Sequence, residues 1–245
     1  MKMELPAHNT LSLTRMHVAR TRLQDEVYER LCDLILNGEI APGQLITVQA
    51  LCDAFGVSAM PVREALQRLV AAKALTTISG RSIGIPVLTP ERLQDLARVR
   101  LAVEGEAAEW AVDHVSDEAL SRLEHLIDQM DRAVDEQDVK AFIRSNKDFH
   151  FTIYQLSGSD VAYAIIEGLW LQIAPYFHDL YVLDRYVKAG DDHRMVLDGL
   201  KTRNRSMVGQ GIRSDIEGGS RLLLSMLTAS RSPGRSTDTE QPVTS

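Results

Sequence analysis

The sequence of 245 residues predicts a mainly α-helical protein, in which an N-terminal winged helix-turn-helix is followed by an all-helical antiparallel bundle. Two observations predict this fold. First, residues 50–70 hold two helical segments around a glycine-containing turn, and two short strand-like segments follow. Second, long amphipathic segments joined by short connections fill the chain beyond residue 89, with no strand signal.

The first predicted helix covers residues 22–36. Its apolar residues recur every three or four positions and therefore form one stripe, as in a helix that packs on one side. The stripe consists of Leu23, Val27, Leu31, Leu34 and Ile35. The helix ends at Asn37-Gly38, and residues 39–45 follow as a turn.

A helix over residues 58–70 is the centre of the N-terminal part. Ser58 is a good N-cap, and Pro61 lies in the first turn, where a missing N–H has little effect. Its inward stripe is Val62, Ala65, Leu66, Leu69 and Val70. Arg63 and Gln67 are neighbours on the opposite face. A short helix over residues 50–54 precedes it, so the pattern alone fits a helix-turn-helix or two packed surface helices equally well.

Two short strands are expected at residues 75–78 and 83–87, around a tip at residues 79–81, and they complete a wing. Three motifs carry a resemblance over residues 21–88: Gly38-Glu39-Ile40-Ala41-Pro42-Gly43, Gly56-Val57-Ser58 and Pro61-Val62-Arg63-Glu64-Ala65-Leu66. With them the sequence resembles the GntR family of bacterial transcription regulators. The resemblance implies a DNA-binding domain.

The candidate DNA-contacting residues lie on or directly before the two helices of the motif, on the first helix and at the wing tip. They are Arg22, Gln49, Ser58, Ala59, Met60, Arg63, Gln67 and Arg81. We expect Arg63 to reach a guanine edge or a neighbouring phosphate in the major groove. Ala59 stands where the family commonly has Arg, so one charged contact is missing and Met60 is expected to touch a thymine methyl instead.

The chain divides into four segments. We expect a flexible arm over residues 1–20, the winged domain over 21–88, a helical effector and dimerisation domain over 89–230, and a disordered tail over 231–245. Thr89 and Pro90 mark the start of the first bundle helix, as N-cap and first helical residue. The bundle helices are expected at residues 90–113, 116–135, 138–156, 160–182, 190–202 and 205–228.

Charge and composition indicate a globular protein of the cytoplasm. The net charge of −7 belongs to the second part, since residues 1–88 hold nine Lys and Arg against eight Asp and Glu, whereas residues 89–245 hold 18 against 26. No apolar run approaches the roughly 20 residues that span a bilayer, and no signal peptide is recognisable. Cys32 and Cys52 are expected to be reduced, buried thiols.

Four polar residues lie on apolar stripes of three predicted bundle helices: Asn146, His150, His193 and Asp215. Asn146 and His150 are four residues apart and point the same way. Burying such groups is costly unless they are paired or bind a metal, so the set predicts either a hydrogen-bonded cluster or a site for a divalent cation. Arg100 is on the stripe of residues 93–107, and either faces the same cavity or pairs with Glu104.

Residues 89–228 resemble the C-terminal effector domain of the FadR-type branch of the GntR family, the FCD domain. The elements that carry this resemblance are Asn146-Lys147-Asp148-Phe149-His150 and Asp192-His193. In metal-binding members an Asp and three His hold Zn²⁺ or a similar ion beneath a pocket for a small carboxylate. Here Asn146 takes the place of the Asp and Asp215 that of a His, and Arg100 is the candidate effector-binding residue.

The resulting hypothesis is a metabolite-responsive repressor that binds a palindromic operator in double-stranded DNA as a homodimer. Its effector would be a small organic acid, held in the helical domain over a divalent metal ion such as Zn²⁺. The alternative is a metal-dependent enzyme built on the bundle. The sequence has no general base next to a nucleophile and no phosphate-binding glycine loop, so we predict that the protein is not an enzyme.

Overall fold

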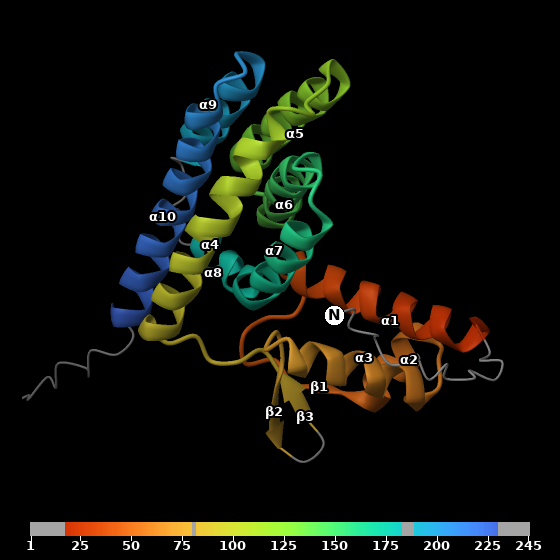
Figure 1. Ribbon diagram of the computed structural model, residues 1–245. Helices are drawn as coiled ribbons and strands as arrows, with labels where there is room; N and C mark the ends of the chain where they lie inside the picture. Colours follow the sequence, from red (N-terminus) through yellow and green to blue (C-terminus); the bar gives the residue numbers. More distant parts are fainter. Residues whose placement is uncertain (1–17, 80–81, 183–188, 230–245) are drawn as a thin grey trace, which may run out of the picture.

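Two helical units, joined at residues 85–89, make up the part of the chain that the computed structural model describes, residues 18–79, 82–182 and 189–229 (Figure 1). The predicted fold class is confirmed. The tail expected over residues 231–245 and most of the arm expected over residues 1–20 lie outside the described residues. Residues 18–20, expected in the arm, belong instead to the first helix.

The smaller unit holds three helices and a three-stranded sheet. They are α1 (Val18–Leu36), β1 (Ile46–Thr47), α2 (Val48–Phe55), α3 (Ala59–Ala71), β2 (Thr76–Ser79) and β3 (Ser82–Gly84). α1 packs on α3, and the core between them is closed, since Leu31 and Ile35 of α1 and Val62 and Leu69 of α3 are fully buried. Gly56, with φ +67°, ends α2 in the left-handed conformation that glycine adopts without strain.

The sheet has the strand order β1-β3-β2, with antiparallel pairing throughout. β1 was not predicted, because a strand of two residues shows no alternation; its Ile46 pairs with Ile83. β3 ends at Gly84, before the predicted end at residue 87. Pro86 has no N–H to donate to a ladder, and residues 85–88 instead connect the wing to the bundle.

The larger unit is a bundle of long helices and one short, broken segment. Its elements are α4 (Pro90–Ala111), α5 (Asp117–Asp135), α6 (Val139–Leu156), α7 (Asp160–Ile173), η1 (Ala174–Tyr176), α8 (Phe177–Val182), α9 (Ala189–Lys201) and α10 (Arg205–Ala229). α10 packs along α4 and α9, and α5 packs along α6 and α9. The single helix predicted over residues 160–182 is wrong, because Pro175 lacks an N–H and its ring clashes with the carbonyl four residues earlier.

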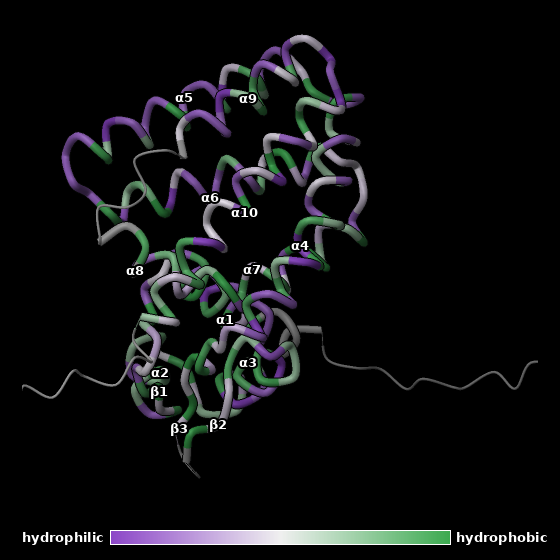
Figure 2. The backbone as a smooth tube through the Cα atoms, turned by 90° about the vertical axis from the view of Figure 1, so that its left-hand side faces the viewer, coloured by the Kyte–Doolittle hydropathy of each residue, from purple (hydrophilic) through white to green (hydrophobic). Residues whose placement is uncertain are grey.

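α7 and η1 form the end of the bundle that faces the smaller unit, where they pack against α1 (Figures 1 and 2). The hydroxyl of Tyr176 in η1 donates a hydrogen bond to the carbonyl of Pro86 in the connection. The two units therefore touch through side chains as well as through the chain itself. No helix in the described ranges is long and apolar enough to cross a membrane.

Candidate functional site

The outer face of α3 carries four of the predicted DNA-contacting residues. Ala59, Met60, Arg63 and Gln67 are all exposed, while the opposite face of the helix is buried. Ser58 occupies the N-cap position with an extended backbone, although its side chain makes no capping bond. The exposed residues therefore extend from the N-terminus of α3 to its third turn.

The remaining predicted DNA-contacting residues are spread over other elements. Gln49 is exposed on α2 and donates a hydrogen bond of 2.9 Å to Asp53 Oδ1. Arg22 lies in α1, but its side chain is outside the described part of the structure, as is the whole of Arg81. Arg68, also on α3, turns back to α1, where it pairs with Asp25 at 2.9 Å and stacks over the ring of Tyr28.

Three of the four polar residues predicted to cluster do meet inside the bundle. His150 of α6, His193 of α9 and Asp215 of α10 each offer a ligand atom, and these atoms lie within 4.8 Å of one another. His150 Nε2 is 3.3 Å from His193 Nε2 and 3.3 Å from Asp215 Oδ2. Both imidazoles are at most 1% exposed. This buried group could hold a metal ion.

A chain of hydrogen bonds orients the ring of His150. The hydroxyl of Tyr154 donates to Glu104 Oε2 at 2.6 Å, so its oxygen is left to accept from His150 Nδ1 at 3.1 Å. Nδ1 then carries a proton, and Nε2 is the ring nitrogen that faces His193 and Asp215. A second group that orients a ligating His in this way is common in metal sites. Two ring nitrogens that face each other at 3.3 Å fit either a shared proton or a shared cation.

Glu104 is a buried hub that the sequence did not reveal. It is fully buried and accepts from Arg100 Nε at 2.5 Å, from Tyr154, and from Trp170 Nε1 at 3.0 Å. Of the two predicted roles of Arg100, the pair with Glu104 is thus present. The only signal in the sequence was the spacing of four residues between Arg100 and Glu104, because Tyr154 and Trp170 lie 50 and 66 positions away.

The charged groups of this region shift one another's pKa values. Burial acts to lower the pKa of Arg100, but its pair with Glu104 outweighs burial and raises it. Burial acts to raise the pKa of Asp215, but its interactions with His150, His193 and Arg100 outweigh burial and lower it. Burial and the neighbouring Glu104 raise the pKa of the Tyr154 hydroxyl, which therefore stays protonated. The region holds an ionised Asp215 beside two imidazoles.

A small cavity of about 10 Å³ lies beside the cluster, and Arg100, Asn146, Asp215 and Trp170 are among its walls. It has room for one group the size of a water molecule. The Oδ1 atom of Asn146 is buried and finds no hydrogen-bond partner among the described residues. The fourth predicted residue therefore faces the same cavity as Asp215 and has an acceptor atom that is unsatisfied.

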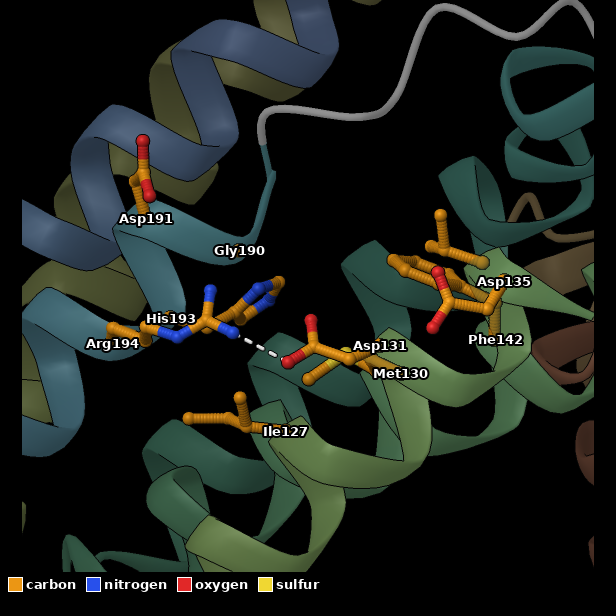
Figure 3. Close-up of a pocket in the computed structure, with 10 residues that line it drawn as sticks. Ile127, Met130, Asp131, Asp135, Phe142, Gly190, Asp191, His193 and Arg194 are labelled. Carbon is orange, nitrogen blue, oxygen red and sulfur yellow. Dashed lines mark hydrogen bonds and ion pairs between the residues drawn. The ribbon is translucent and has the colours of Figure 1, made fainter.

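A larger cavity of about 250 Å³ opens on the other side of His193, between α5 and α9 (Figure 3). Its apolar walls include Ile127, Met130 and Phe142. Figure 3 shows Arg194 reaching across the cavity from α9 to Asp131 on α5, with which it pairs at 2.5 Å. Two further aspartates line it, so this cavity is net acidic.

Both units match models of known protein families. The model for "Bacterial regulatory proteins, gntR family" matches residues 23–85, and that for the FCD domain matches residues 95–218. Over 144 residues the chain is 31% identical to the HTH-type transcriptional regulator McbR of Escherichia coli (strain K12), a match that spans 59% of this chain and 65% of that protein. Over 227 residues it is 26% identical to the HTH-type transcriptional repressor NanR of Enterobacter sp. (strain 638), spanning 84% and 86%.

Solved structures agree with this comparison. The structure of E. coli McbR/YncC superposes with a TM-score of 0.77 and 25% identity, covering 83% of this chain and 98% of that one. A GntR transcriptional regulator from Rhodococcus sp. RHA1 superposes with a TM-score of 0.68 at 23% identity, covering 84% and 98%, and so shares the fold.

Proposed function

This chain belongs to the GntR family of bacterial regulators, in the branch with a C-terminal FCD domain, and we propose that it is a repressor whose operator binding responds to a small organic acid. It is a DNA-binding transcriptional regulator and not an enzyme, so the alternative of a metal-dependent enzyme is set aside. The observation that supports an effector site is the buried group of His150, His193 and Asp215. We further propose that it acts in the cytoplasm.

The residues present fit a divalent cation such as Zn²⁺. Two imidazole nitrogens and one ionised carboxylate are an ordinary donor set for such an ion, and the unsatisfied Oδ1 of Asn146 offers a fourth, weaker oxygen. His150 and His193 would hold the ion through Nε2, with Asp215 as the anionic ligand. The ion would supply a positive charge toward which an organic acid is attracted. Because a neutral amide replaces the usual carboxylate, we expect weak binding that chelators reverse.

Arg100 supports the choice of an acid as effector. Its guanidinium lines the small cavity together with Asp215 and Asn146, and only one carboxylate, Glu104, pairs with it among the described residues. A cavity of about 10 Å³ is too small for an organic acid, so binding requires one of the helices around it to move away. A ligand that must displace a helix to enter favours one arrangement of the domain over another, which is what a regulatory switch needs.

Operator recognition is assigned to α3 in the major groove, with Arg63 as the residue that reads a base edge. One short helix buries too little surface to be specific, so two copies should bind the half-sites of a palindrome. The acidic bundle is the expected dimer surface. Sedimentation at micromolar concentration should show a dimer with and without DNA, and a monomer in both cases would contradict the proposal.

The DNA-binding part is tested with a pair of arginines on α3. Arg63→Ala should weaken operator binding by about 1–3 kcal/mol, because a contact to a base or phosphate is lost. Arg68→Lys is the control. Arg68 contacts Asp25 and Tyr28 of α1, and Lys keeps the positive charge at this position. Electrophoretic mobility shift at fixed salt measures both. If Arg63→Ala binds the operator as tightly as the parent does, the proposed placement of α3 in the major groove is wrong.

The effector part is tested on His193. His193→Ala should lower the metal content of purified protein and abolish the release of operator by organic acids, while free protein still binds operator. His125→Ala is the matched control, because His125 is an exposed histidine on α5 bonded only to Gln129 among the described residues. The effector proposal is refuted if the parent protein contains no metal and His193→Ala responds to acids as the parent does. The three residues would then form only a hydrogen-bonded cluster.

A further inference from the structure

A groove with uncharged walls lies where the two units meet. Its volume is about 340 Å³, larger than either cavity near the metal-ligand candidates. Its walls come from the turn at residues 42–45, the wing, the connection at residues 85–88, Tyr176 of η1 and Leu227 of α10. No described residue in these walls is ionisable at neutral pH.

Exposed apolar side chains gather at this groove. Leu45, Ile78 and Val87 line it and are 57%, 52% and 84% exposed. Single exposed apolar residues are ordinary on a protein surface, but several that converge on one concave place form a patch that favours contact with an apolar partner.

Close contacts hold the walls of the groove together. At Gly84 a Cβ atom would lie 2.9 Å from the backbone oxygen of Gln44, so wing and turn are in close contact there. Ile85 and Leu88, the first and last residues of the connection, are almost fully buried. The hydroxyl of Tyr176 donates to the carbonyl of Pro86 and ties the two walls together. A preformed groove binds without first having to order its walls.

We propose that this groove is a second ligand site, separate from the His150–His193–Asp215 cluster, and that it takes a small, uncharged and mainly apolar molecule. An ionised ligand would lose its hydration without gaining a counter-charge from these walls. The volume falls in the range of about 300–1,000 Å³ that small-molecule pockets occupy, and interfaces between domains are a preferred place for them.

Because the groove lies between the two units, a bound molecule contacts both of them. A molecule in the groove contacts the wing and turn of the smaller unit on one side, and Tyr176 and Leu227 of the bundle on the other. Its binding energy therefore depends on the mutual arrangement of the units, and binding favours the arrangement seen here. This effect does not require the metal-ligand candidates.

The test uses 1-aminoanthracene, a fluorescent dye that is uncharged at neutral pH, and full-length protein labelled at the isoleucine δ1 methyls. Titration should give saturable binding, with methyl shifts at Ile78 and Ile85 and none at Ile127, which lines the α5–α9 cavity. The same result is expected in the presence of EDTA, so failure of the metal proposal does not affect it.

Two exposed valines supply the matched variants. Val87→Asp places a carboxylate at the rim of the groove and should weaken dye binding at least about tenfold, because the apolar dye then faces a charge. Val161→Asp makes the same change on α7, where valine is 72% exposed and away from the groove walls, and should change affinity less than about twofold. Thermal melts verify that both variants fold.

Three results of the titrations would overturn the proposal. They are dye binding that does not saturate, methyl shifts confined to residues outside the groove, and equal affinity of the two aspartate variants. Loss of dye binding as the protein concentration rises would show that a second copy of the chain covers the groove, and this too would overturn it.

Discussion

Replacing Glu104 by Gln should strongly destabilise the bundle. The side chain is fully buried and is the partner of Arg100, whose own side chain is 5% exposed. Gln keeps the shape but removes the charge, so Arg100 stays buried without a counter-charge. One oxygen of the carboxylate also becomes an NH₂ group that faces donors. Breaking a buried ion pair in this way costs about 3–5 kcal/mol.

The measurement is the free energy of unfolding from urea titrations in EDTA, with equal m-values as the condition for comparing variants. Glu106→Gln is the control on the same helix. Glu106 is 55% exposed and pairs with Arg213 at 3.1 Å, so its replacement should change stability by less than about 1 kcal/mol. If Glu104→Gln is no more destabilising than this control, the hub does not hold the bundle together as we reason.

Three further predictions concern other parts of the two units. Burial raises the pKa of the Cys32 thiol to about 11, so only about one thousandth of it is thiolate at pH 8, and DTNB should react with half-buried Cys52 well before Cys32. Gly211→Ala would bring a Cβ within 2.6 Å of a valine methyl on α9 and should destabilise by about 1–3 kcal/mol, whereas Gly218→Ala on the same helix meets no described atom and should stabilise by up to about 1 kcal/mol in urea titrations. Tyr154→Phe leaves Nδ1 of a buried histidine without its acceptor and should lower the free energy of unfolding by about 1–3 kcal/mol.

Much of the fold is readable from the sequence because helix signals are local. The bundle helices other than the one predicted over residues 160–182 have ends within two residues of those predicted, since caps such as Thr89 and Ser116 accept the N–H groups that a helix start leaves free. The break in the helix predicted over residues 160–182 is signalled by Pro175, but apolar periodicity alone does not take proline into account. β1 has no local signal, because a strand of two residues forms only by pairing with β3, which lies far away in the sequence.

The candidate cluster is only partly readable. A polar residue on an apolar stripe must find a partner when buried, and this argument alone brings His150, His193 and Asp215 together. It does not reveal which partners those are. Glu104 reads in the sequence as one half of a pair within a helix, and its bonds to Tyr154 and Trp170 depend on how α4, α6 and α7 pack.

The same hub bears on how a signal could reach the DNA-binding face. Trp170 donates to Glu104 and also lines the small cavity, and it lies on α7, the helix that packs against α1. If α7 is the helix that the proposed acid displaces, the segment on which the smaller unit rests moves with it. Coupling between sites requires an element with two arrangements that both ligands bias. Of the described elements, the segment from α7 through η1 meets the geometric part of this requirement, since it contacts the cluster side through Trp170 and the connection through Tyr176.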